Sequence, residues 1–173
     1  MEKKMDIQYR MAELTDLEEI TALVRQAALE MSCRGIDQWD ELYPIREDFE
    51  QDIRRGQMTV GTLAGRAAVI YTINGACDPE YEGAAWKYPD KSCCILHRLC
   101  VNPLFQNRGI ARQTMEHLER ENAAKGVEAI RLDVFSRNVY ALKLYRNCGF
   151  EKVGTVRWRK GLFYLMEKYL TNQ

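Results

Sequence analysis

The stretch Gln106-Asn107-Arg108-Gly109-Ile110-Ala111 stands between two segments with different hydrophobic patterns. The apolar run Ile95–Val101 precedes it and predicts a strand, and the residues that follow it have helical spacing. The first backbone N–H groups of a helix have no intrahelical partner, and the helix dipole places partial positive charge there. A strand, a short turn with a glycine and a helix N-terminus therefore predict a site for an anion.

Two features of this turn favour a phosphate group as the anion. Gly109 lacks a Cβ, so that a phosphate can approach the backbone closely. Arg108 and Arg112 add positive charge beside the helix N-terminus. An ordinary helix start with one glycine is the alternative interpretation, and the turn alone does not decide between the two.

The composition is that of a globular protein without a strongly charged partner. Of the 173 residues, 46% are hydrophobic and 29% charged, and 25 basic side chains balance 25 acidic ones, which argues against nucleic acid and membrane surfaces. No apolar run approaches the roughly 20 residues that a membrane span needs. The segment Met1–Asp6 has no apolar stretch behind its charges, so it does not resemble a secretory signal. We expect one domain over residues 1–173, located in the cytoplasm.

Strand and helix patterns interleave in the centre of the chain, and hairpins flank both ends. Strands are predicted at 6–11, 57–64, 67–74, 92–101, 128–135, 151–157 and 162–169, and helices from the capping box Thr15–Glu18, at 45–55, at 109–124 and from Asn138 to Asn147. This order predicts an α/β protein, an α+β sandwich with a mixed, mostly antiparallel sheet of about seven strands and helices on both faces.

The six cysteines predict neither a disulfide framework nor a metal site. The chain is long enough to build a core without disulfides, and it contains no C-x-x-C motif. Cys94-x-x-His97-x-x-Cys100 mimics a metal-ligand spacing, but the alternation along a strand turns His97 away from the two thiols. We expect reduced, mostly buried cysteines and no metal.

A second informative block is Asn138–Phe150, with the sequence NVYALKLYRNCGF. It resembles the N-x-x-A-x-x-x-Y-x-x-x-G-F segment of the GNAT superfamily of N-acetyltransferases. The earlier block, Leu99-Cys100-Val101-Asn102-Pro103 followed by Gln106–Ala111, is similar to the (Q/R)-x-x-G-x-(G/A) turn with which that family binds a pyrophosphate. The two blocks together, in this order, make the resemblance much more specific than either block alone.

The resemblance implies a sheet splayed open between its fourth and fifth strands, with acetyl-CoA in the gap. Leu99 and Val101, on a cofactor-binding strand that includes Cys100, would pair with the pantetheine through their backbone groups. Asn138 would hydrogen-bond the pantetheine arm, and Ala141 would leave room for it. The pyrophosphate would be held by the amides of Gln106, Asn107, Arg108, Gly109, Ile110 and Ala111, with Arg112 beside them.

The same resemblance implies that Tyr145 is the general acid that protonates the departing CoA thiolate. A core aromatic on an amphipathic helix is the alternative for this residue. Many relatives use a glutamate on or near the fourth strand as the base, but the corresponding strand here offers no carboxylate. His97 is the candidate base, because the ordinary pKa of histidine, about 6.5, suits a base near neutrality. It would share a face with Leu99 and Val101 unless a bulge changes the parity, and a structural histidine is the alternative.

The acceptor side is predicted less firmly from the segment Gly35–Pro44, a region that usually forms part of the acceptor pocket in the family. Trp39 and Tyr43 are candidates to line the pocket, and Asp37, Asp40 or Glu41 to attract a cationic amine. Packing of the helix connection is an equal alternative. Trp86, in the long loop 75–91, is a weaker candidate for substrate binding.

These features predict an acetyl-CoA-dependent N-acetyltransferase that works by direct attack in a ternary complex, without a catalytic cysteine. The aromatic, acidic segment and the long loop favour a small primary amine or amino-acid-like metabolite as acceptor. A protein N-terminus or lysine is the alternative acceptor, and an acyl-CoA-binding module without turnover is the alternative function. Residues 162–169 are a candidate edge for a homodimer.

Overall fold

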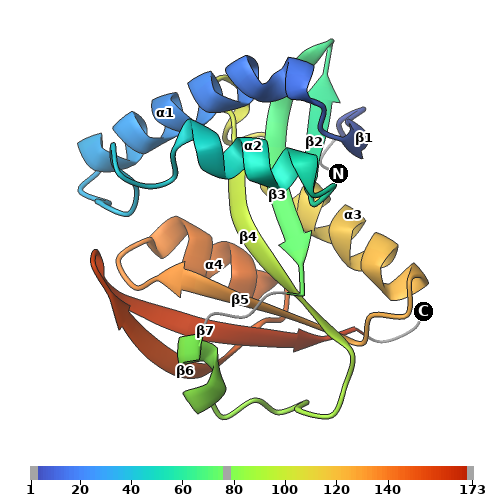
Figure 1. Ribbon diagram of the computed structural model, residues 1–173, viewed down its shortest axis with the longest axis vertical. Helices are drawn as coiled ribbons and strands as arrows, with labels where there is room; N and C mark the ends of the chain where they lie inside the picture. Colours follow the sequence, from blue (N-terminus) through green and yellow to red (C-terminus); the bar gives the residue numbers. More distant parts are fainter. Residues whose placement is uncertain (1–3, 76–78, 171–173) are drawn as a thin grey trace. The chain divides into compact units, whose positions relative to one another are not determined.

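The computed structural model describes residues 4–75 and 79–170, which contain four α-helices and seven strands (Figure 1). In chain order they are β1 (Gln8–Met11), α1 (Leu17–Cys33), α2 (Arg46–Arg54), β2 (Met58–Leu63), β3 (Arg66–Asn74), β4 (Cys93–Val101), α3 (Ile110–Ala124), β5 (Ala129–Phe135), α4 (Val139–Asn147), β6 (Glu151–Trp158) and β7 (Gly161–Tyr169). Every predicted strand and helix is therefore present, with small shifts of its bounds.

The strands form a hydrogen-bonded sheet in the order β1-β2-β3-β4-β5-β7-β6. Because β7 pairs with both β5 and β6, the prediction that residues 162–169 form an edge is wrong. The β4–β5 pair is parallel, whereas the β1–β2, β2–β3, β5–β7 and β6–β7 pairs are antiparallel. The β4–β5 ladder runs only from Cys93↔Ala129 to Leu96↔Leu132, although both strands continue beyond it. The predicted mixed, mostly antiparallel sheet is confirmed, and the early end of this ladder agrees with a splay between the fourth and fifth strands.

The chain divides into two compact units. The first unit comprises Met1–Thr72 and Arg98–Thr114, and the second comprises Ile73–His97 and Met115–Gln173. The boundary crosses β4 between His97 and Arg98, so that the two halves of this strand belong to different units. The prediction of one domain over the whole chain stays a prediction.

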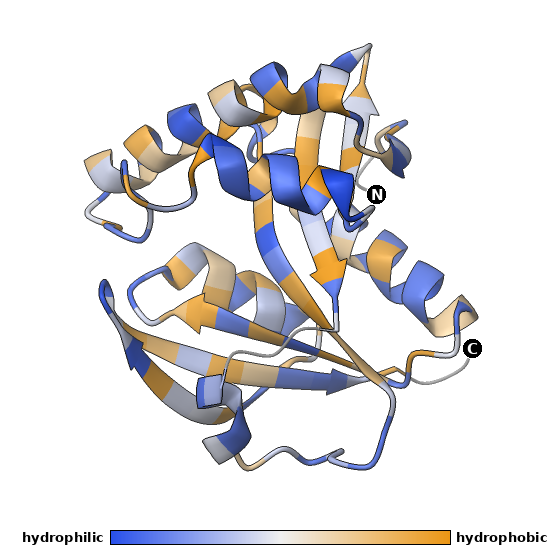
Figure 2. Cartoon of the chain, viewed as in Figure 1, coloured by the Kyte–Doolittle hydropathy of each residue, from blue (hydrophilic) through white to orange (hydrophobic). Residues whose placement is uncertain are grey.

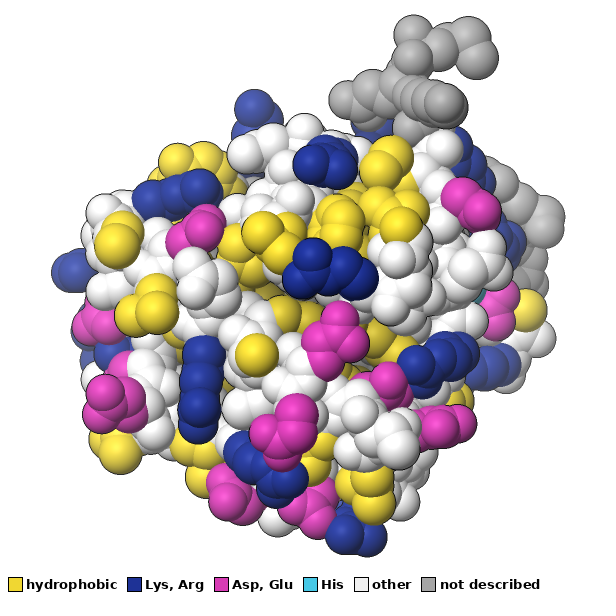
Figure 3. All heavy atoms as spheres, turned by 90° about the horizontal axis from the view of Figure 1, so that it is seen from above, with side chains coloured by type: hydrophobic (Ala, Val, Ile, Leu, Met, Phe, Trp, Pro, Cys, Tyr) yellow, Lys and Arg dark blue, Asp and Glu magenta, His cyan; other side chains and the backbone are white. Residues whose placement is uncertain are grey.

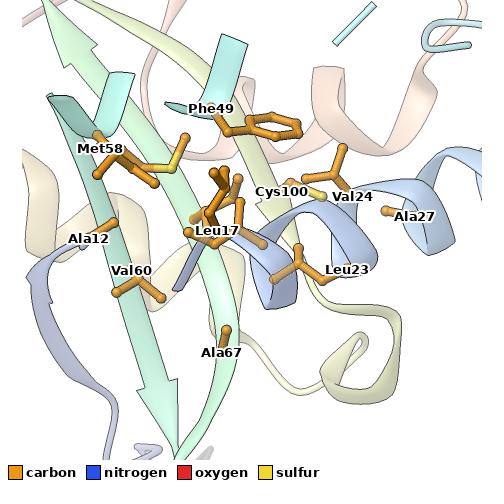
Figure 4. Packing of buried hydrophobic residues seen from close by; sticks show 13 residues of the cluster. Ala12, Leu17, Leu23, Val24, Ala27, Phe49, Met58, Val60, Ala67 and Cys100 are labelled. Atoms are coloured by element: carbon orange, nitrogen blue, oxygen red, sulfur yellow. The ribbon is translucent and has the colours of Figure 1, made fainter. Parts of the chain in front are cut away.

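In the first unit, α1 and α2 cover one face of β2 and β3 (Figure 4). Phe49 of α2 and Met58 of β2 are buried in this cluster, 1% and 0% exposed, and Cys100 of β4 joins them. The helix α1 forms because its apolar side chains recur at helical spacing, and the same side chains supply its buried face: Leu17, Ile20, Leu23, Val24 and Ala27. The side of α2 that faces the viewer in Figure 2 is largely hydrophilic.

The other face of these strands is covered by the start of α3. Ala68 and Val69 of β3 are fully buried there with Ile110, the first residue of α3. A register irregularity follows Gly61 in β2, and a Cβ built on Gly61 would lie 2.7 Å from the Val69 side chain. Glycine therefore permits this close approach, and helices lie on both faces of the strands, as predicted.

The start of α1 differs from the prediction. The sequence predicts a capping box at Thr15–Glu18, but Leu14–Asp16 forms a turn of 3-10 helix and α1 begins after it. Asp16 Oδ2 accepts the backbone N–H of Glu13 at 2.7 Å, and the two carboxylate oxygens accept from the guanidinium of Arg10 at 2.7 and 2.8 Å. The predicted capping box is therefore wrong. Asp16 instead caps the 3-10 turn that precedes α1, and Arg10 of β1 donates to its carboxylate.

Candidate functional site

The turn before α3 has the backbone shape that its sequence predicts. Asn107 and Gly109 have φ values of 61° and 74°, in the left-handed region, and α3 begins at Ile110. Left-handed residues in such a turn point backbone N–H groups to one side, which makes an anion-binding concavity. The N–H groups of the first turn of α3 add to it, because they have no intrahelical acceptor. This backbone fits a phosphate group.

The side chains around the turn add positive charge. Arg108 and Arg112 are exposed, and the guanidinium carbon of Arg108 lies 5.7 Å from the ring centre of Phe105. The side-chain amide of Gln106 donates to the carbonyl of Val101 at 3.4 Å. The predicted pyrophosphate residues therefore combine backbone donors with two solvent-facing cations.

The strand before the turn is fixed by Asn102, whose role the sequence did not indicate. Its backbone N–H donates to Ala68, its side-chain amide donates to Ala67, both at 2.8 Å, and its Oδ1 accepts from the N–H of Leu104 at 3.0 Å. Leu99 and Val101 pack against the cluster that contains Ile110, whereas Cys100 belongs to the cluster under α1. The two residues predicted to pair with pantetheine thus share a face of β4.

Arg98 of β4 is a left-handed residue inside a strand, with φ 51°. This conformation costs a residue with a Cβ about 1–2 kcal/mol, so it persists only where the surroundings support it. It also interrupts the regular alternation from which His97 was expected to share a face with Leu99 and Val101.

The support comes from a buried network around the Arg98 side chain. Its Nε and Nη2 lie 2.8 and 2.6 Å from Asp52 Oδ2, and its Nη1 donates to the Tyr43 hydroxyl at 2.9 Å. Thr72 donates its hydroxyl to the same carboxylate oxygen at 2.8 Å. The side chains of Arg98 and Asp52 are only 14% and 5% exposed. Burial lowers the pKa of Arg98, but Tyr43 and Asp52 outweigh it and raise that pKa overall, so the guanidinium stays charged.

A pocket of about 900 Å³ lies in the first unit, lined by α1, the connection that follows it and the start of α2. Trp39 contributes to its wall, and Leu29 and Leu42 on its lining are 63% and 71% exposed. Four carboxylates outnumber two guanidinium groups among the lining residues, which are Asp37, Asp40, Glu41 and Glu47 against Arg25 and Arg46. This excess of negative charge favours a cationic ligand.

The residues predicted to form the acceptor site separate into different roles. Trp39 lines the pocket, whereas Tyr43 is not among the lining residues and bonds through its hydroxyl to Arg98. Asp40 lines the pocket, but its Oδ1 also accepts the N–H groups of Leu42 and Tyr43 at 2.9 and 3.3 Å. Asp40 therefore shapes the connection as well as carrying charge.

In the second unit, Tyr145 lies on the buried face of α4. It is 8% exposed, and its ring makes an edge contact with Phe150 at 5.8 Å between centroids. Burial raises the pKa of this phenol well above its ordinary value, and Asp133 and Cys148 raise it further. The phenol therefore stays protonated, which a general acid requires, and the same burial fits a core aromatic.

Asn138 and Ala141, the predicted pantetheine residues, are joined at the start of α4. Asn138 Oδ1 accepts the backbone N–H of Ala141 at 3.0 Å, which caps the helix as the sequence predicts. His97, half-buried in the same unit, has its Nε2 3.0 Å from Asn74 Oδ1. Because an amide oxygen only accepts, this contact favours the tautomer with the proton on Nε2 and a lone pair on Nδ1.

Trp86, the third predicted substrate residue, packs within the second unit. Its indole N–H donates to the carbonyl of Tyr81 at 2.8 Å, and its ring centre lies 4.3 Å from the guanidinium carbon of Arg131. Tyr81 donates its hydroxyl to Asp133 at 2.5 Å, and Arg131 donates to Glu167 at 3.0 Å. These contacts anchor the described part of the long loop and give Trp86 a structural task.

The described part of the chain offers no metal-binding cluster, and two of its thiols are buried. No group of three or more His, Cys, Asp or Glu side chains there is arranged to hold a metal ion. Burial raises the pKa values of Cys94 and Cys100 to about 12. Cys77 lies outside the described residues.

On the face drawn in Figure 3, acidic, basic and hydrophobic side chains are interspersed. No helix of residues 4–75 and 79–170 is long and apolar enough to cross a membrane.

The sequence model described as the acetyltransferase (GNAT) family matches residues 37–150, which include most of the predicted acceptor segment, the predicted pyrophosphate turn and the block around Tyr145. The chain belongs to the GNAT family of acetyltransferases. This assignment confirms the resemblance and the class of enzyme that the two sequence blocks predicted.

Solved structures agree with this assignment at the level of the fold. A GNAT-family acetyltransferase from Streptococcus agalactiae has a TM-score of 0.84, covers 96% of this chain and 96% of its own, and is 23% identical. The PaiA N-acetyltransferase of Thermoplasma acidophilum, solved in complex with coenzyme A, has a TM-score of 0.73, covers 95% and 99% of the two chains and is 18% identical. The predicted fold class is confirmed.

The names of two curated relatives bear on the identity of the acceptor. The [ribosomal protein bS18]-alanine N-acetyltransferase of Salmonella typhimurium is 39% identical over 62 residues, 36% of this chain and 41% of the relative. The N-alpha-acetyltransferase RimI of Mycobacterium tuberculosis is 35% identical over 103 residues, 59% and 54% of the two chains. The matched part thus spans about half or less of these relatives. Their names contradict our prediction of a small-molecule amine acceptor, because the first specifies an alanine of a ribosomal protein.

Proposed function

We propose that this chain transfers the acetyl group of acetyl-CoA to the N-terminal α-amine of a protein. The observation that carries the proposal is the left-handed turn at Asn107 and Gly109, which opens α3 inside the stretch that matches the GNAT family. The names of the curated relatives support a protein acceptor with a free N-terminal alanine.

The donor is held by the first unit in this proposal. The pyrophosphate accepts hydrogen bonds from the backbone N–H groups of residues 107–111, whereas that of Gln106 donates to the carbonyl of Pro103 at 3.4 Å, and Arg108 and Arg112 supply countercharge. The pantetheine pairs with the backbone of Leu99 and Val101. Asn102 holds this end of β4 against β3 through its hydrogen bonds to Ala67 and Ala68. The family resemblance also assigns Asn138 and Ala141 to pantetheine binding.

The reaction is a direct aminolysis of the thioester. The neutral amine nitrogen attacks the acetyl carbonyl carbon, a C–N bond forms, the C–S bond breaks, and the CoA sulfur leaves as a thiolate. Tyr145 gives its hydroxyl proton to that sulfur, and its raised pKa keeps it protonated until then. His97, which contacts Asn74 at 3.0 Å through Nε2, takes the proton from the attacking amine.

The acceptor enters the pocket of the first unit. An N-terminal amine is cationic before it loses its proton, and the excess of carboxylates around the pocket favours that charge. The exposed apolar lining residues Leu29 and Leu42 offer contact area to the residues that follow the N-terminus.

A thiol-release assay tests the proposed function. Acetyl-CoA is incubated with the protein and a peptide that begins with a free alanine, or with the same peptide blocked at its N-terminus, and free CoA thiol is measured. We expect release with the free peptide and only background release with the blocked one. If acetyl-CoA binds but no peptide or amine stimulates release, the chain is a binding module without turnover, which contradicts the proposal.

A further inference from the structure

Arg98 joins three segments of the first unit at one guanidinium group. Tyr43 belongs to the connection before α2, Asp52 belongs to α2, and Thr72 of β3 donates to the same carboxylate. The pair of Arg98 and Asp52 is nearly enclosed. Since the guanidinium is a rigid planar fork, Tyr43 and Asp52 cannot move independently while it holds both.

The backbone end of this contact controls β4. The left-handed conformation of Arg98 sets the direction in which the strand continues to Leu99, Cys100 and Val101. Cys100 and Asn102 fix the strand on the far side of Arg98, through the core cluster and through bonds to β3. The strained residue Arg98 therefore lies next to an anchored part of the strand, and its side-chain partners determine whether the strain persists.

The other end of the contact controls the pocket wall. Tyr43 and Asp40 form an isolated β-bridge, in which the N–H of Asp40 donates to the carbonyl of Tyr43 at 3.0 Å. Asp40 and its neighbours Trp39, Glu41 and Leu42 line the pocket. A shift of the Tyr43 hydroxyl therefore moves one end of the segment that forms this wall.

We propose that Arg98 is a positioning residue that couples the pocket wall to the strand Leu99–Val101. The proposal rests on the proposed function, because it takes this strand as the donor site and the pocket as the acceptor site. A donor that pairs with Leu99 and Val101 stabilises the conformation at Arg98, and the guanidinium then holds Tyr43 and the wall in place. Donor binding thereby favours acceptor binding, and by linkage the acceptor tightens the donor by the same factor.

Hydrogen–deuterium exchange with CoA as the probe tests this coupling without an acceptor. The variant Tyr43→Phe removes the hydroxyl that Arg98 contacts and leaves the Arg98–Asp52 pair in place. In the wild type, we expect saturating CoA to slow amide exchange at 106–111 and, about fivefold or more, at 37–45. In Tyr43→Phe, we expect the slowing at 106–111 to remain and the slowing at 37–45 to disappear.

Tyr9→Phe is the matched control, because it removes a phenol hydroxyl that lies 3.0 Å from Thr114 Oγ1 elsewhere in the first unit. It is expected to behave as the wild type. Equal protection of 37–45 in the wild type and in Tyr43→Phe, or no protection there in either, would overturn the coupling while leaving the donor site intact. Absence of protection at 106–111 in the wild type would overturn the donor site, and the coupling with it.

Discussion

The buried environment of Tyr145 suits both a general acid and a core aromatic side chain. Burial holds the ring against Phe150 and raises the pKa of the phenol, and the nearby charge of Asp133 raises it further. A raised pKa means that the protonated form persists to higher pH than in a free tyrosine, whose pKa is about 10. As an acid, Tyr145 therefore remains competent throughout the range in which an amine becomes neutral.

Replacing Tyr145 by phenylalanine tests this role. We expect kcat for acetyl transfer to fall roughly 10²-fold, with little change in stability, because the ring remains. The ratio of wild-type to variant kcat is expected to stay constant from pH 7 to pH 9, since neither protein loses a proton from this position. A ratio that declines toward one as the pH rises would show an acid of lower pKa and would contradict the assignment. Tyr164→Phe serves as the control, since Tyr164 packs under Lys152 through its ring.

The pKa values of two cysteine thiols are raised for the same reason as that of Tyr145. Burial raises the pKa values of Cys94 and Cys100 to about 12, so that at pH 8 only about one such thiol in 10⁴ is ionised. We expect iodoacetamide to modify the exposed Cys33 first and to leave Cys94 and Cys100 unmodified in the native protein, as mass spectrometry of peptides will report. Rapid modification of Cys100, with loss of activity, would argue for a catalytic thiol.

At the scale of elements, the start of α1 depends on a contact that bridges β1 and the helix. Asp16 caps the preceding turn while it pairs with Arg10, and this hydrogen bond lowers the pKa of Asp16. A lowered pKa in the folded state stabilises the fold above the unfolded value of about 3.9, and this stabilisation is lost as the pH falls through the folded pKa.

We expect Asp16→Asn to reduce the free energy of unfolding by about 1 kcal/mol at pH 7. The difference from the wild type is expected to shrink below about pH 4, where the carboxylate of the unfolded chain becomes protonated, and to vanish below the lower pKa of the folded state. Thr15→Ala, at the position that the sequence suggested as the cap, is the matched control and should change the free energy of unfolding by less than about 0.5 kcal/mol. Urea unfolding at several pH values provides the measurement, and a larger loss for Thr15→Ala would restore the original capping box.

The turn before α3 offers a second test at this scale. Gly109 and Gly126, near the two ends of α3, both have positive φ, at 74° and 83°. Alanine at either position adds backbone strain of about 1 kcal/mol. Only Gly109→Ala is expected to weaken CoA binding, by about tenfold, because only that Cβ would stand at the proposed anion site. Titration calorimetry with CoA distinguishes the two variants, and equal affinities would contradict the proposed pyrophosphate turn.

Elements with local signals were predictable from the sequence, and contacts between distant segments were not. The turn of the β2–β3 hairpin carries its signal in one residue, Gly65, which has a positive φ of 75°. By contrast, Arg98, Asp52 and Tyr43 belong to no motif, and only the folded chain brings their side chains together. The left-handed conformation of Arg98 has no local sequence signal either, because arginine seldom adopts it.

At the scale of the whole molecule, the family and the fold class followed from two sequence blocks, whereas the donor residues that these blocks imply stay a prediction. The acceptor did not follow, and the expectation of a small amine was wrong. An acidic, aromatic connection attracts any cationic amine, so that its composition does not distinguish a metabolite from a protein N-terminus. Trp86 shows the same limit, since an aromatic loop residue serves packing as well as binding.

The position of the transferred acetyl group tests the central claim most directly. A peptide with a free N-terminal alanine and an internal lysine is incubated with the protein and isotopically labelled acetyl-CoA, and the product is fragmented by tandem mass spectrometry. We expect the label on the α-nitrogen of the alanine and none on the lysine side chain. Label on the lysine, or on a small amine in preference to the peptide, would contradict the proposed acetylation of a protein N-terminus.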